Sequence, residues 1–106
     1  MDKTRIPRAH STQEYVSMVE QAIDEVWDLR QSIEYDEDYM ADSRAFIDRL
    51  DVMLKQLYQS MKDGEYKFAT GDLPFMEIVE NYHDAQLPFK FLLKRINATH
   101  LKGLDV

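Results

Sequence analysis

The alternation of hydrophobic and polar positions predicts two long amphipathic helices in the first 62 residues. When residues 12–33 are placed at 100° intervals, their apolar side chains gather on one half of a helix and their polar side chains on the other. Arg30 is the exception, because it falls inside the apolar half. We expect its guanidinium to extend past the end of the core into water. A buried ion pair or a contact with a partner is the alternative for this side chain.

Residues typical of helix starts and ends occur at the expected boundaries of the two helices. Ser11 and Glu14 have the spacing of a capping box, in which each side chain accepts a hydrogen bond from the other residue's backbone N–H. A second apolar stripe covers residues 38–62, and Gly64 follows it where a helix commonly ends in the left-handed conformation. Two helices of similar length with a short connection predict an antiparallel hairpin. Residues 65–71 are interpreted as a loop that lies on the bundle.

Two segments with the same opening follow the loop. The triplets Leu73-Pro74-Phe75 and Leu87-Pro88-Phe89 each place a proline where a helix favours one, at its first position. They predict shorter helices over 73–84 and 87–101, which begin alike without being copies. A decayed internal repeat is one alternative, and a single long helix kinked at Pro88 is another.

These patterns together predict an all-α fold, a small helical bundle. At 106 residues the chain is short enough for a single domain, residues 11–106, preceded by a flexible basic arm of residues 1–10. Long helices with half-apolar surfaces need cover from the shorter helices or from a second copy of the chain. A homodimer therefore stays open as an alternative.

Composition excludes several kinds of chemistry. The chain has no cysteine, which excludes disulfides, thiolate metal sites and a cysteine nucleophile and fits a reducing compartment. It has no apolar run of the length that a signal peptide or a membrane span needs, so we expect a cytoplasmic protein that is not bound to a membrane. Its three glycines are not clustered, so a phosphate-binding loop is excluded. We expect no cofactor and no catalytic residues.

Charge is distributed unevenly along the chain. The net charge is −7, but residues 11–85 carry −12 while residues 1–10 carry +2 and residues 86–106 carry +3. One interpretation is a DNA-binding regulator that uses the basic helix 87–102 together with the arm. The residues that would contact nucleic acid are Arg5, Arg8, Lys90, Lys94, Arg95 and Lys102. Four cations on one helix are few for a phosphate backbone, and cations near the end of a helix also stabilise that helix.

Glu80 and His83 have the Glu-x-x-His spacing that points both side chains into the core of carboxylate-bridged metal bundles. Such bundles need two copies of the motif and two further glutamates, and this chain has one copy. A metal-carboxylate bundle is therefore the weaker alternative, and an exposed histidine is the simpler interpretation of His83.

Aromatic residues make up 11% of the chain, and six methionines accompany them. Most of these side chains would fill the core, but aromatic residues and methionine are also enriched at protein interfaces. We therefore predict a non-catalytic adaptor, regulator or accessory subunit that binds a protein, through an acidic hairpin and an aromatic patch. The predicted partner-binding residues are Trp27, Glu20, Asp24, Asp28, Phe75, Tyr82 and Phe89. The acidic stripe would suit a partner with a basic surface.

Overall fold

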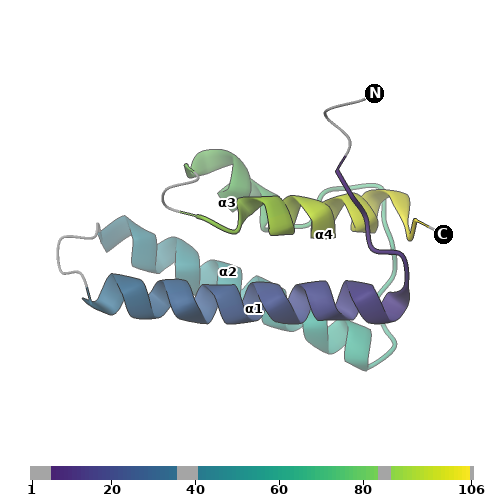
Figure 1. The fold of residues 1–106 in the computed structure, drawn as a ribbon, viewed down its shortest axis with the longest axis horizontal. Coiled ribbons are helices and arrows are strands. Elements are labelled where there is room, and N and C mark those ends of the chain that lie inside the picture. Colours follow the sequence, from purple (N-terminus) through teal and green to yellow (C-terminus); the bar gives the residue numbers. More distant parts are fainter. Residues whose placement is uncertain (1–5, 36–40, 84–86, 106) are drawn as a thin grey trace.

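The chain folds into a small all-α bundle, as predicted, and the described residues contain no strand. The computed structural model describes residues 6–35, 41–83 and 87–105. Its helices there are α1 (Thr12–Tyr35), α2 (Ala41–Lys62), α3 (Met76–Asn81) and α4 (Lys90–Lys102). Helices α1 and α2 form one layer, and α3 and α4 lie together over it (Figure 1).

Helix α1 begins with half of the predicted capping box. The backbone N–H of Glu14 donates to the Ser11 hydroxyl at 3.1 Å, as expected. The Glu14 carboxylate does not return to Ser11 and instead accepts the N–H of His10 at 3.3 Å. The Glu14 carboxylate thus accepts a backbone N–H at the start of the helix, as in a capping box. The donor is His10, however, and not Ser11, the residue that the capping box requires.

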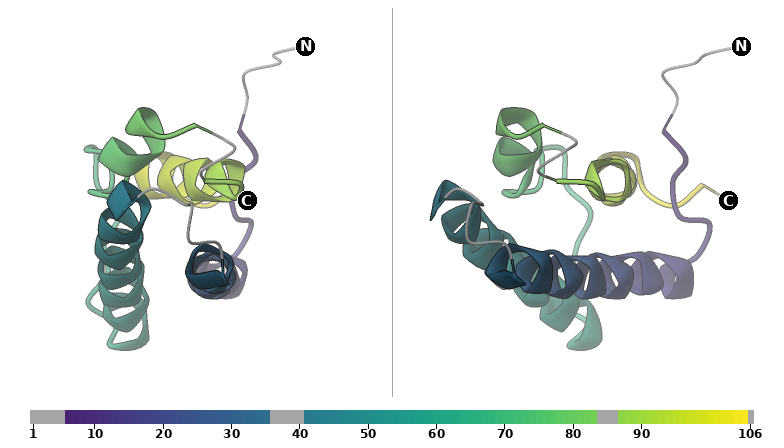
Figure 2. Two further views of the ribbon diagram at one scale, coloured as in Figure 1. Left: turned by 90° about the vertical axis from the view of Figure 1, so that its left-hand side faces the viewer. Right: turned by 60° about the vertical axis from the view of Figure 1, so that its left-hand side comes forward.

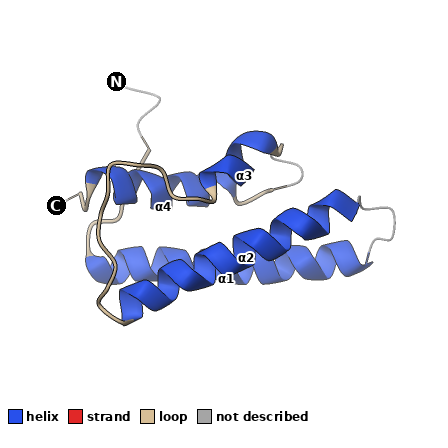
Figure 3. Ribbon diagram, turned by 180° about the vertical axis from the view of Figure 1, so that it is seen from behind, coloured by secondary structure: helices blue, strands red, loops and turns tan. Residues whose placement is uncertain are grey.

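Helices α1 and α2 run side by side in opposite directions, which confirms the predicted hairpin (Figure 3). The predicted start of the second helix at Asp38 lies outside the described residues, and the described helix begins at Ala41. Its end agrees with the sequence, because Gly64 has a φ of +73° just beyond Lys62. A left-handed residue at this position lets the chain turn away from the helix at little steric cost.

Both Leu-Pro-Phe triplets form the same turn. The N–H of Met76 donates to the carbonyl of Leu73 at 3.0 Å, and the N–H of Lys90 donates to the carbonyl of Leu87 at 3.2 Å. In each triplet the leucine and the phenylalanine are buried and the proline is exposed. The common opening is therefore a shared local structure, a turn that inserts two apolar side chains into the core.

This turn corrects the predicted bounds of the two shorter helices. The prolines lie inside the turns and not at the first helical position, so both helices begin three residues later than predicted. Helix α3 also ends at Asn81, before the predicted residue 84, because Tyr82 is extended (φ −122°, ψ 147°). The alternative of one long helix kinked at Pro88 is wrong for the same reason.

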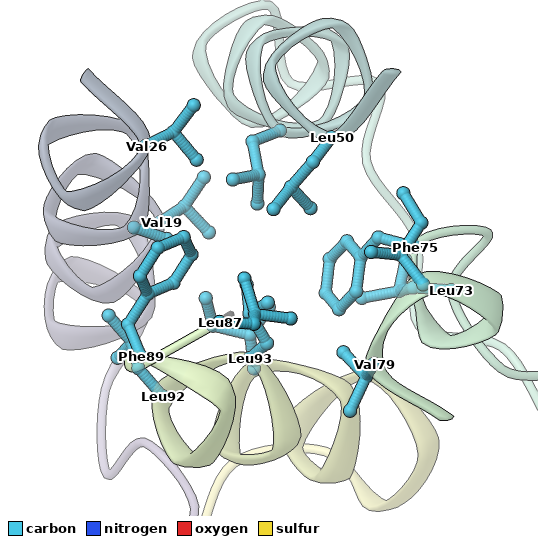
Figure 4. Packing of buried hydrophobic residues seen from close by; sticks show 14 of the residues in the cluster. Val19, Val26, Leu50, Leu73, Phe75, Val79, Leu87, Phe89, Leu92 and Leu93 are labelled. Atoms are coloured by element: carbon cyan, nitrogen blue, oxygen red, sulfur yellow. The ribbon is translucent and has the colours of Figure 1, made fainter. Parts of the chain in front are cut away.

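The hydrophobic core lies between the two layers and receives side chains from both (Figure 4). Val19 and Val26 of α1 point toward Leu50 of α2 and toward the phenylalanines of the two triplets. The largest fully buried side chains are Phe46, Phe75, Ile47, Leu50, Leu54, Ile78, Leu87, Leu93, Ile96, Val19, Val26 and Val79. The shorter helices thus cover the apolar face of the hairpin, as the bundle prediction required.

The segment before α1 crosses α4 and is fixed there (Figure 1). Ala9 is fully buried, its N–H donates to the Thr99 hydroxyl at 3.0 Å, and its carbonyl accepts the N–H of Asp105 at 2.8 Å. The predicted arm of residues 1–10 is thus connected at Ala9 to α4 and to the residues that follow it. Residues 1–5 lie outside the described residues.

Candidate functional site

Trp27 lies on the surface of α1, with 60% of its side chain exposed. It borders a shallow cleft of about 250 Å³ between the hairpin helices, which Ile23 and Arg30 of α1 and Asp51 and Lys55 of α2 also line. When the residues of α1 are placed at 100° intervals, Trp27 falls at the edge of the apolar half of the helix. That edge faces the seam between α1 and α2, where one part of the indole can contact protein and the rest faces solvent.

The predicted acidic residues lie next to Trp27. Glu20, Asp24 and Asp28 are all exposed, and their spacing of four residues places them in one stripe along α1. The Tyr58 hydroxyl of α2 donates to the Glu20 carboxylate at 3.3 Å, so this end of the stripe touches the second helix of the hairpin. Exposed carboxylates beside an exposed indole form a surface with both charge and apolar area.

Arg30 is engaged within the hairpin. Its guanidinium lies 3.0 Å from the carboxylate of Asp48 and 3.7 Å from that of Asp51, and Asp51 also pairs with Lys55 at 3.0 Å. The arginine side chain is 37% exposed, so these ion pairs are surface pairs that bridge the two helices. The interpretation of Arg30 as reaching past the core into water is therefore incomplete, because it also connects α1 to α2.

The other predicted partner-binding aromatics belong to the core. Phe75 is 1% exposed and Phe89 is 6% exposed, so neither presents a surface to a partner in this structure. Tyr82 is partly buried, and its ring lies 4.1 Å from that of Phe46, centroid to centroid. The predicted aromatic patch over residues 73–91 is therefore not a surface feature. In that segment the exposed phenylalanine is Phe91, at 57%, which the sequence reasoning did not single out.

The Glu-x-x-His pair does not lie on one helix. Helix α3 ends at Asn81, so Glu80 is in its last turn and His83 is beyond it. Both side chains are exposed. Across residues 6–35, 41–83 and 87–105, no group of three or more histidine and carboxylate side chains is arranged to hold a metal ion. The predicted helical spacing of these two ligands is therefore wrong.

The basic residues of the last helix separate into two groups. Arg95 turns toward the arm, where its Nε donates to the carbonyl of Pro7 at 3.1 Å and its guanidinium lies 3.8 Å from Glu14. Lys90, Lys94 and Lys102 instead line one groove together with Arg8. Arg5 lies outside the described residues. The predicted nucleic-acid face is thus divided, because its arginine on α4 is paired elsewhere.

A partly buried chain of hydrogen-bonding side chains connects α1, the loop after α2, and α4. The Tyr66 hydroxyl lies 2.6 Å from Nδ1 of His100 and 2.8 Å from the hydroxyl of Tyr15. The Tyr15 hydroxyl also lies 3.2 Å from the carbonyl of Ile96. The ring of Phe68 stacks on that of Tyr15 at 6.0 Å. The sequence predicted a loop on the bundle here but did not identify this network, because its members are distant along the chain.

Burial shifts the pKa of all three titratable side chains in this hydrogen-bonded network, Tyr15, Tyr66 and His100. Burial raises the pKa of Tyr15 and of Tyr66, because the phenolate would lose its hydration. Burial lowers the pKa of His100, although a hydrogen bond with the backbone of Gly71 and the charge of Asp72 act in the opposite direction. Tyrosines with a raised pKa stay protonated at neutral pH, so they act here as hydrogen-bonding groups that hold the loop in place.

Comparison with models of protein families, with curated proteins and with solved structures finds no match for this chain. Among the helices of the described ranges, none has both the length and the apolar character required to cross a membrane.

Proposed function

We propose that this protein is a non-catalytic adaptor, regulator or accessory subunit that binds a partner protein through Trp27 and the acidic stripe of α1. The observation that carries the proposal is the exposure of Trp27, at 60%, beside a cleft between the hairpin helices. Tryptophan is enriched among the residues that dominate binding energy, because one side chain buries a large area at small entropic cost.

The charge next to Trp27 defines the chemistry of the partner. Glu20, Asp24 and Asp28 are exposed along one side of the helix, so a basic surface would complement them. Such complementarity accelerates association and excludes acidic partners, while the indole supplies apolar contact area. The lack of cysteine fits a reducing compartment, and a cytoplasmic location is part of this proposal.

The proposal is tested by purifying the tagged protein from its native host alongside two variants. We expect Trp27→Ala to lose partners that the parent retains, and Val52→Ala to retain them, since Val52 is 53% exposed on α2. Each shared partner is then produced in isolation and titrated. Loss of the same partners from both variants, or from neither, contradicts the proposal.

Trp27 also provides a direct spectroscopic signal, because it is the only tryptophan of the chain. Its fluorescence emission should move to shorter wavelength when a partner covers the indole. An acidic-to-basic change, Asp24→Lys, should weaken binding and make the remaining affinity less sensitive to salt. If raising the protein concentration alone shifts the emission and yields a dimer in sedimentation, the surface belongs to a second copy and not to a different protein.

A further inference from the structure

A groove lined by both apolar and positively charged side chains lies on the side of α4 that faces away from the hairpin. Its volume is about 730 Å³. In the view along α4, helix α3 lies on one side of α4 and the N-terminal arm on the other (Figure 2, right). Met76 and Val79 contribute from α3, Ile6 from the arm, and Ala98 and Leu101 from α4. Asn97 also lines the groove, and Val79 is only 1% exposed. The apolar surface open to a ligand therefore comes from Ile6, Met76, Ala98 and Leu101, which together form the apolar base of the groove.

Four cations line the same groove. Lys90, Lys94 and Lys102 come from α4 and Arg8 from the arm, and Glu80 is the one acidic residue among the described lining residues. Within the described part of the chain, Lys94 and Lys102 have no carboxylate within ion-pair distance, and both are exposed. A protein with a net charge of −7 therefore carries a local basic surface here.

The cations are spread along the groove and do not converge on one point. Lys90 and Lys102 are twelve residues apart on one helix, which corresponds to about 18 Å at a rise of about 1.5 Å per residue. A small anion would contact one of these positions at a time. A linear ligand with several negative charges would match all of them.

The apolar base distinguishes among linear anions. Single-stranded nucleic acids bind by stacking their bases on aromatic side chains, and none of the described residues that line the groove is aromatic. A duplex presents phosphates and offers nothing to fill an apolar base. An amphipathic helix with acidic residues flanking an apolar stripe matches both features, because its apolar stripe can enter the groove while its carboxylates meet the lysines.

The groove is also held in its observed shape. The arm is fixed by the two backbone hydrogen bonds of Ala9 and by the bond from Arg95 to Pro7. Arg8 lies 3.6 Å from Asp105, and the Lys90 ammonium donates to the carbonyl of Tyr82 at 2.6 Å. Walls that are already ordered reduce the entropic cost of binding.

We propose that this groove binds an acidic amphipathic helix of a partner protein, about three turns long, with its apolar stripe on Met76, Ala98 and Leu101. This surface is distinct from that of Trp27, and its partner has the opposite charge. The protein would then connect a basic partner on α1 to an acidic one on α4.

The test uses a fluorescein-labelled synthetic helix of about 14 residues, with leucines on one face and glutamates on the other. Its binding to the full chain is followed by fluorescence anisotropy. We expect micromolar binding that weakens at least about tenfold in a double variant, Lys94→Glu with Lys102→Glu. The matched control is Lys62→Glu with Lys67→Glu, which changes the net charge equally on exposed lysines outside the groove and should leave binding unchanged. Circular dichroism melts establish that both double variants are folded.

Several outcomes would overturn the proposal. If a scrambled peptide of the same composition binds equally well, charge alone explains the binding and the apolar stripe makes no contribution. Tighter binding of a labelled DNA duplex or single strand would assign it to nucleic acid. A homodimer that dissociates only in the Lys94/Lys102 variant would assign it to a second copy. Trp27→Ala should leave peptide binding intact, so the two proposals succeed or fail separately.

Discussion

The Tyr66 hydroxyl lies 2.6 Å from Nδ1 of His100, and this contact joins the loop after α2 to the last helix. The two rings also meet edge to face, with centroids 5.6 Å apart. His100 is buried, and its backbone carbonyl accepts the N–H of Ala69, so the loop is connected to this residue twice. Since burial lowers the pKa of His100, the folded protein holds this imidazole in its neutral form.

The stability of the protein should therefore depend on pH through His100. Its pKa is lower in the folded chain than the unfolded value of about 6.5, so the unfolded chain binds more protons in that range. The free energy of unfolding should be highest above the unfolded value of about 6.5 and fall as the pH is lowered through it toward the lower pKa of the folded protein. Urea unfolding at a series of pH values measures this. His100→Gln should flatten this dependence.

Removing the Tyr66 hydroxyl should destabilise the fold. Tyr66→Phe leaves Nδ1 of His100 without this partner, while the Tyr15 hydroxyl keeps the carbonyl of Ile96 as its acceptor. An unsatisfied buried polar group costs about 1–3 kcal/mol. The control is Tyr58→Phe, whose hydroxyl meets Glu20 at the surface and should contribute less than about 0.5 kcal/mol. Denaturant midpoints compare the two variants. Equal losses in both would show that the buried hydroxyl chain contributes nothing specific.

Asn97 is a second buried connection between distant segments. Its side-chain oxygen accepts the N–H of Leu73 at 2.8 Å, and its nitrogen donates to the Asp72 carboxylate at 3.0 Å. Asn97→Ala should cost about 1–3 kcal/mol, because the buried N–H of Leu73 loses its acceptor. Asn81→Ala is the control, since its bond to the Glu77 carbonyl is exposed. Thermal melts should separate the two variants by several degrees, and coincident melts would contradict this account.

The hairpin could be predicted from the sequence because its information is local. Apolar and polar positions of α1 separate almost completely around the helix, and Ser11 and Gly64 act through neighbours within a few residues. The exposure of Trp27 followed from the same periodicity. Helix bounds near the Leu-Pro-Phe triplets were wrong because proline suits both a turn and the first position of a helix. Local sequence does not distinguish these two uses.

The remaining features depend on residues that are far apart in the sequence. The groove needs Arg8 near Lys94, and the arm is fixed by contacts across about 90 residues, from Ala9 to Thr99. A local sequence pattern does not indicate which distant residues come together in the fold. The aromatic patch was misassigned for a related reason, because a phenylalanine after a turn gives no sign of whether it enters the core or faces a partner.

Phe89 and Phe91 provide the sharpest test of that distinction, since they are two residues apart and only Phe89 was predicted to contact a partner. Phe89 is 6% exposed, so Phe89→Ala removes a core side chain and should cost about 3–5 kcal/mol, a large share of the stability of a small domain. Phe91 is 57% exposed, and Phe91→Ala should change the free energy of unfolding by less than about 0.5 kcal/mol. Urea unfolding followed by circular dichroism measures both. A small loss of unfolding free energy in Phe89→Ala would indicate that Phe89 is not a core residue and would support the aromatic patch as a binding site. A large loss in Phe91→Ala would indicate that a second chain covers Phe91 on α4.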